Sequence, residues 1–239
     1  MLAPFLAIIE QKEPALPHED AVHDARVACR RVRAALRLLG LRELDRPVKD
    51  LQDALGDVRD LQLQVDWFRS RDERLHRQRA ALARKATKAL SAAVRRWHVR
   101  TLPLLLQADL TRPSGRRIRK VLRKRFEKLD QRLEAARARP TPRAMHRARI
   151  SVKQVRYLLE LAAPQLPGRV AARISDLKSL QASLGELHDV DVRIGLLRGR
   201  RALLREEQEA RARLLRISLA QLRRWHQQDL AARARRALQ

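Results

Sequence analysis

The chain has 239 residues, of which 45% are apolar, and a formal net charge of +27 at neutral pH. The apolar share argues against disorder, and the length is sufficient for one large domain or two small ones. The single cysteine excludes an intramolecular disulfide, and no apolar run approaches the roughly 18 residues of a membrane span. We therefore predict a cytoplasmic protein without a membrane partner, and the large positive charge favours a polyanionic one.

Glycine and proline are scarce and separate long helical stretches, and no stretch shows the alternation of a strand. Thr141 is expected to cap a helix whose first residue is Pro142. A longer helix is expected to bend at Pro103. The predicted helices cover residues 2–13, 19–39, 47–68, 72–109, 116–137, 142–164 and 169–197, and a last helix after Gly199 reaches the C-terminus. The predicted fold class is all-α.

Two of these helices carry cationic or protonatable residues at spacings of three, four and three, which places them in one row on one helix face. The N-terminal basic column is His23, Arg26, Arg30 and Arg33, and the C-terminal basic column is His146, Arg149, Lys153 and Arg156. A wholly apolar row runs beside each column, so each helix has one face for a core and one that repels itself. Because this costly arrangement occurs twice, we interpret it as functional.

The duplication extends beyond these helices. The segment VKDLQDALGDVRDLQLQV from Val48 matches LKSLQASLGELHDVDVRI from Leu177, and RRWH occurs at both 95–98 and 223–226. We predict two halves, residues 1–112 and 113–239, each of four helices with a short first helix in the first half. Two related bundles favour pseudo-two-fold packing, which would bring both basic columns to one shared groove.

The paired H-x-x-R-x-x-x-R/K-x-x-R helices, each followed by a K-x-L-Q-x-x-L-G-x-x-x-D helix, resemble the CHAD family, the conserved histidine α-helical domain. The resemblance implies two four-helix bundles around a basic groove that binds inorganic polyphosphate. Members are often fused to a triphosphate-tunnel catalytic domain, whose E-x-E-x-K signature is approached only by residues 207–211, in helical sequence. In the second copy Gln154 stands opposite Arg31 and Glu160 opposite Arg37, so Arg31 and Arg37 are left out of the site.

The predicted function is non-catalytic binding of polyphosphate or another phosphate polyanion, with no metal or cofactor and with an association with polyphosphate granules. Arginine offers planar forks to phosphate oxygens, lysine a point charge, and a histidine at a helix start can become charged when phosphate arrives. The predicted binding residues are His23, Arg26, Arg30, Arg33, Lys49, His146, Arg149, Lys153, Arg156 and Lys178.

Two other functions remain open. The net charge alone would be adequate for a nucleic-acid-binding protein, although aromatic residues, which stack on bases, make up only 3% of the chain. A metal-dependent phosphohydrolase would use His188 and Asp189, but Arg59 occupies the matching position of His188 in the first half and cannot bind a metal.

Several residues beside the motifs have structural interpretations. Gly56 and Gly185 lie inside helices, which indicates close approach of a helix or a ligand. The tryptophans of both RRWH segments and Cys29 are expected in the core. Nearby carboxylates are expected to hold the basic side chains through paired contacts: Asp57, Asp60, Glu186 and Asp189.

Overall fold

The computed structural model describes residues 1–108 and 113–238. The chain divides into two compact units, Met1–Pro113 and Ser114–Gln239, here called the N-terminal and C-terminal halves. The described residues form helices and no strand, which confirms the all-α fold class. Within the described residues, no helix combines the length and apolar character needed to cross a bilayer.

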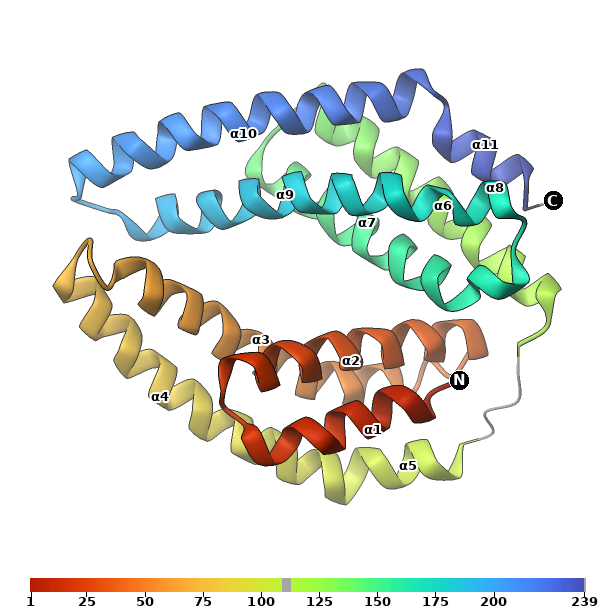
Figure 1. The fold of residues 1–239 in the computed structure, drawn as a ribbon, viewed down its shortest axis with the longest axis horizontal. Coiled ribbons are helices and arrows are strands. Elements are labelled where there is room, and N and C mark those ends of the chain that lie inside the picture. The colour runs from red at the N-terminus through yellow and green to blue at the C-terminus, as the bar shows by residue number, and fades with distance from the viewer. Residues whose placement is uncertain (109–112, 239) are drawn as a thin grey trace. The chain divides into compact units, whose positions relative to one another are not determined.

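The N-terminal half is a bundle in which α2 packs between α1 and α3, and α3 packs against α4 (Figure 1). Its helices are α1 (Ala3–Lys12), α2 (Glu19–Leu39), α3 (Asp45–Phe68), α4 (Glu73–Arg96) and α5 (Leu102–Gln107), with a 3-10 turn at Glu13–Ala15. The predicted end of α2 is confirmed, because Gly40 adopts a φ of 89° and its N–H donates to the Leu36 carbonyl at 2.8 Å.

The long helix predicted for residues 72–109 is interrupted in the structure. A π-helical segment, Trp97–Thr101, follows α4, and the Leu102 N–H donates to the Trp97 carbonyl. Pro103, which lacks an N–H, lies directly after this bond at the start of α5. The expected bend is thus accompanied by a wider helical turn, and the predicted end at Asp109 lies outside the described residues.

In the C-terminal half, α7 packs against α6 and α9, and α9 packs against α10. The helices are α6 (Gly115–Ala138), α7 (Pro142–Ala162), α8 (Gly168–Ala171), α9 (Arg173–Leu196), α10 (Arg201–Gln227) and α11 (Leu230–Arg236), with a 3-10 turn at Ala163–Gln165. The predicted cap of α7 is confirmed, since Thr141 Oγ1 accepts from the Ala144 N–H at 3.2 Å.

Two predicted helices of this half are wrong in detail. The helix expected at residues 169–197 consists of α8 and α9. The last helix does not continue to the C-terminus, because Asp229 adopts a φ of 48° and separates α10 from α11. The chain end is therefore a separate short helix that packs against α6.

The apolar rows beside both basic columns form core, as predicted. Val22, Val32 and Leu36 on α2 are fully buried, as are Val152 and Leu159 on α7. Burial of these apolar rows fixes the orientation of α2 and α7 about their helix axes. That orientation in turn determines the direction in which the basic columns face.

The other residues assigned to the core are also buried. Trp97 and Trp225 are each 3% exposed. Burial raises the pKa of the Cys29 thiol to about 12, so this cysteine stays protonated and unreactive at neutral pH. The equivalent helices of the two halves agree in length, since α2 and α7 have 21 residues each and α3 and α9 have 24 each.

Candidate functional site

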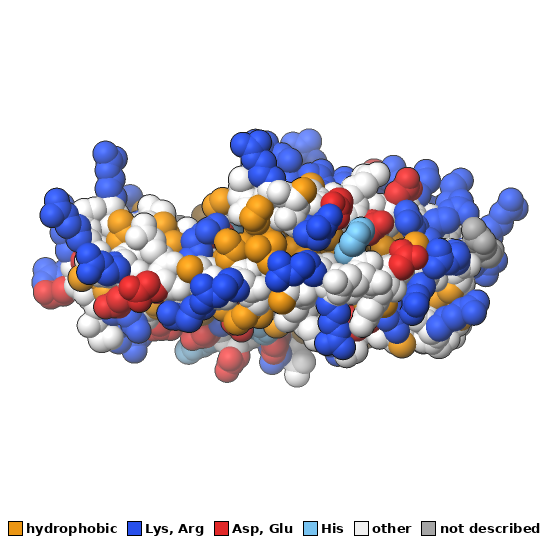
Figure 2. Space-filling view, turned by 90° about the horizontal axis from the view of Figure 1, so that it is seen from above, with side chains coloured by type: hydrophobic (Ala, Val, Ile, Leu, Met, Phe, Trp, Pro, Cys, Tyr) orange, Lys and Arg blue, Asp and Glu red, His pale blue; other side chains and the backbone are white. Residues whose placement is uncertain are grey.

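Positive charge is widely distributed over the surface. On the face drawn in Figure 2, Lys and Arg side chains are spread broadly with fewer Asp and Glu among them. On α6, the basic residues Arg116, Lys120, Arg123 and Lys124 are all exposed. Positive charge alone therefore does not identify a binding site. The site is identified from the spacing and contacts of the residues in the two basic columns.

The N-terminal basic column presents its first three residues with few internal contacts. His23 is exposed and Arg26 and Arg30 are half-buried. Arg26 pairs with Asp60 of α3 at 3.5 Å, as predicted for this carboxylate. Arg30 makes no hydrogen bond or ion pair with any residue that the structure describes. Its guanidinium is therefore available to an anion.

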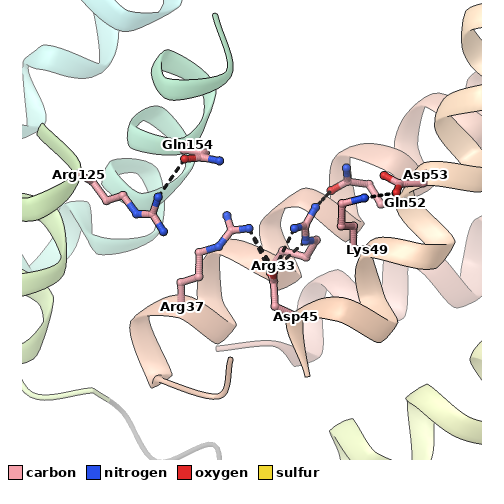
Figure 3. Close-up of polar contacts among 8 residues, drawn as sticks. All are labelled: Arg33, Arg37, Asp45, Lys49, Gln52, Asp53, Arg125 and Gln154. Atoms are coloured by element: carbon pink, nitrogen blue, oxygen red, sulfur yellow. Dashed lines mark hydrogen bonds and ion pairs between the residues drawn. The ribbon is translucent and has the colours of Figure 1, made fainter. Parts of the chain in front are cut away.

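Arg33, the last residue of this column, is bound firmly within its own half (Figure 3). It donates to both carboxylate oxygens of Asp45, at 3.0 and 2.9 Å, and to Gln52 Oε1 at 3.1 Å. Arg37 also pairs with Asp45, at 3.1 Å. Burial raises the pKa of Asp45, but the two arginines outweigh it and hold the pKa below its usual value. Asp45 thus anchors the end of the column, a role that no motif in the sequence predicts.

The two lysines predicted from the helix after each column are exposed. Lys49 forms a pair with Asp53 one turn further along α3 (Figure 3), whereas Lys178 has no polar partner among the described residues. A surface pair of this kind contributes about 0–1 kcal/mol, so an anion displaces it at little cost.

Arg156, the last residue of the C-terminal basic column, is held by the same kinds of contact as Arg33, with one difference. Arg156 Nε donates to Gln181 Oε1 at 2.8 Å, which matches the contact of Arg33 with Gln52. Its carboxylate partner is Glu160 on the same helix. Glu160 stands at the position of Arg37, so the departure seen in the sequence supplies the carboxylate that Asp45 supplies in the other half.

His146, the first residue of the C-terminal column, faces His188 of α9. Their Nδ1 atoms are 3.2 Å apart and their ring centroids 4.6 Å apart. Burial and then the charges of Arg149 and Lys153 lower the pKa of His146. Burial, Arg149, His146 and Lys153 lower the pKa of His188 to about 4. Both imidazoles are therefore neutral at pH 7, and the Nδ1–H of one ring can donate to the Nδ1 of the other.

The histidine pair occurs in one half only. Arg59 occupies the matching position in the N-terminal half and pairs with Glu19. Among the described residues, no group of three or more His, Cys, Asp or Glu side chains is arranged to hold a metal ion. The histidine pair was missed from the sequence, because the matching Arg59 gives no reason to expect it.

The glycines that occur in both copies of the duplicated segment lie beside arginines of the basic columns. A Cβ added to Gly56 would lie 3.6 Å from Arg26 Nε, and one added to Gly185 would lie 4.0 Å from Arg149 Nε. These are ordinary contact distances, so an alanine fits at both positions. The distances therefore do not show the close approach of a helix or a ligand that was predicted at each glycine; what lies nearest is an arginine side chain of the neighbouring helix.

We expect Gly56→Ala and Gly185→Ala each to raise the free energy of unfolding by about 0.5–1 kcal/mol, because glycine is a poor helix former. Denaturant unfolding of each variant measures this difference. Gly56→Leu is the comparison, since its larger side chain must move the Arg26 guanidinium and should weaken anion binding. A marked loss of stability in either alanine variant would contradict the contact distances.

The remaining carboxylates and departures have mixed outcomes. Asp57 makes no ion pair within the described residues, and its pKa is raised by burial and by its neighbours Asp60 and Asp53. Glu186 likewise has no ion pair in the described part of the chain. Arg31 lies 5.6 Å from the centre of the Phe5 ring, and Gln154 accepts from Arg125 at 3.1 Å (Figure 3). Arg31 and Gln154, which occupy equivalent positions in the two copies, thus each have a contact within their own half.

Comparisons with known proteins identify the family and the fold. The family model of the CHAD domain matches residues 1–198. A crystal structure of the CHAD domain from the plant Ricinus communis is similar with a TM-score of 0.63 and 24% sequence identity, over 99% of this chain and 88% of that chain. No curated protein matches. The family match over most of the chain means that this protein belongs to the CHAD domain family.

Proposed function

We propose that this protein binds inorganic polyphosphate without catalysis, through the basic columns of α2 and α7. One observation carries the proposal: both helices bury an apolar row and present a row of Arg, Lys and His at matching positions. In each half the end of the column is anchored by a buried or half-buried polar network, and the residues before it face outward or are half-buried.

Polyphosphate suits this arrangement chemically. Successive column residues are one helical turn apart, about 5 Å along the axis, so an extended polyanion along the helix meets a cation at each turn. Phosphate oxygens accept the paired N–H groups of a guanidinium. Aromatic side chains are not required, because a polyphosphate chain has no bases to stack.

The competing function is nucleic-acid binding, and competition between the two polyanions tests the proposal. We expect long-chain polyphosphate to displace bound duplex DNA or RNA at physiological salt, when the two are compared at equal phosphate concentration, because the columns provide cations and little else. Fluorescence anisotropy of a labelled duplex measures displacement. Equal or tighter binding of the nucleic acid would favour the alternative, and the salt dependence of both affinities serves as the control.

We also expect no release of orthophosphate from polyphosphate. The two columns offer cations to hold the anion, and neither brings a carboxylate set for metal ions or a nucleophile to the phosphates. Phosphate release is measured with and without Mg²⁺, Mn²⁺ and Zn²⁺. Turnover that His188→Ala abolishes would contradict the non-catalytic proposal and would favour the metal-dependent phosphohydrolase.

A further inference from the structure

A second group of arginines lies in the C-terminal half and includes no residue of the basic column. It surrounds a pocket of about 370 Å³. The pocket, here called the four-arginine pocket, is lined by Arg169, Arg173, Arg233 and Arg236, together with Ala234 and Ala237. The labels of α8 and α11 mark this end of the C-terminal half in Figure 1.

The fold holds these arginines in place through apolar anchors. On α11, Leu230, Ala231 and Ala234 are at most 4% exposed, and Leu238 just beyond it is 2% exposed. This spacing places one face of α11 in the core, and Arg233 and Arg236 lie one turn apart outside it. The buried face thus docks α11 against the rest of its half.

The other two arginines are positioned in the same way. Val170 of α8 is fully buried, and Arg169 precedes it on the exposed side. Arg173 is the first residue of α9, and both arginines line the pocket. The start of α8 and α9 and the more distant α11 therefore contribute two arginines each, although they lie more than fifty residues apart in the sequence.

The local carboxylates do not balance this charge. Arg173 pairs with Asp176 at 2.8 Å, and Arg236 pairs with Asp229 at 3.0 Å. Arg169 and Arg233 have no hydrogen bond or ion pair with described residues. Arginines one turn apart repel each other, so the arrangement costs stability unless an anion occupies the pocket.

We propose that the four-arginine pocket is a second anion site, which binds a short condensed phosphate such as tripolyphosphate. Two unpaired guanidinium forks can each bind two phosphate oxygens, and the paired arginines add charge around them. The volume lies within the range of small-molecule sites. Among the residues that the structure describes, the pocket lining includes no aromatic side chain that could stack on a base. This site uses residues other than those of the proposed polyphosphate function and stands independently of it.

Isothermal titration of the whole chain with tripolyphosphate tests the proposal. The Arg169→Gln/Arg233→Gln variant should bind at least about 30-fold more weakly than wild type. The control is Arg213→Gln/Arg216→Gln, which removes the same charge from exposed positions of α10 in the same half and should change affinity only a few-fold. Thermal unfolding without ligand checks that both variants are folded. Tripolyphosphate should also protect Arg233 from modification by phenylglyoxal.

A third variant separates this site from the basic column. The Arg149→Gln/Lys153→Gln variant should retain one tight binding site for tripolyphosphate but lose its affinity for long-chain polyphosphate. Equal losses of tripolyphosphate affinity in the pocket variant and the α10 control would mean that binding depends only on general electrostatic attraction. That result would overturn the proposed second anion site. Loss of all tripolyphosphate binding in the column variant would overturn it as well. Unchanged binding of long polyphosphate by the column variant would instead refute the proposed function and leave the pocket standing.

Discussion

Replacing Arg26 and Arg149 with glutamine should lower the affinity for long-chain polyphosphate by about 100-fold or more. The two residues occupy equivalent positions of the two basic columns, and each lies beside a glycine of the next helix. A hydrogen bond to a charged group contributes about 1.5–3 kcal/mol, so two lost guanidiniums account for a change of this size. Titration calorimetry at physiological salt measures the affinity.

The matched control removes the same charge elsewhere. Arg84 of α4 and Arg213 of α10 are exposed, one in each half, and neither has a polar partner among the described residues. Arg84→Gln/Arg213→Gln should weaken binding only a few-fold, because diffuse attraction is screened over a Debye length of about 8 Å. Similar losses in the two double variants would mean that the columns are ordinary solvated faces.

Polyphosphate affinity should rise as pH falls, by up to about tenfold per pH unit for each proton taken up. Without ligand, the lowered pKa values keep His146 and His188 neutral at pH 7. An anion beside them favours the charged form and raises both pKa values, so binding takes up protons below about pH 7. The effect should level off near pH 4, where His188 becomes charged even without ligand.

Calorimetry in buffers of different ionisation enthalpy counts the protons taken up directly. His188→Gln should lower the proton uptake and weaken the pH dependence, because it removes one member of the histidine pair. Comparison at each pH cancels changes in the ligand's own protonation. An unchanged proton uptake in His188→Gln would show that the histidine pair is not linked to binding.

The same lowered pKa values affect folding. Each histidine has a lower pKa in the folded chain than when unfolded, so the pair costs no stability above about pH 6.5 and an increasing amount as the pH falls toward 4. Bound polyphosphate should therefore stabilise the fold more at pH 5 than at pH 7.5.

The helices were largely predictable because local signals determine them. Gly40 after α2 and Thr141 with Pro142 before α7 set these ends through their own backbone and side-chain chemistry. The break at Asp229 was not predictable, because an aspartate in the left-handed region has no sequence signal as strong as glycine. The docking of α11 depends on its packing against α6, which no local pattern contains.

The basic columns were predictable because a helix fixes the spacing of its own residues. Their contacts with other helices were less so. Asp45 anchors two arginines from a neighbouring helix, and its position two residues before Pro47 does not indicate this role. The contact of His188 with His146 was not predicted, since its counterpart in the first half is Arg59, which cannot form such a pair. The four-arginine pocket requires α11 to fold back, so the sequence pattern alone could not predict it.

The crystal structure of this chain with a polyphosphate of defined length tests the central claim most directly. We predict phosphate oxygens within hydrogen-bonding distance of Arg30 in the N-terminal basic column and of Arg149 in the C-terminal one, with Arg33 still bound to Asp45. Polyphosphate that contacts neither column, or that lies only in the four-arginine pocket, would contradict the proposed function.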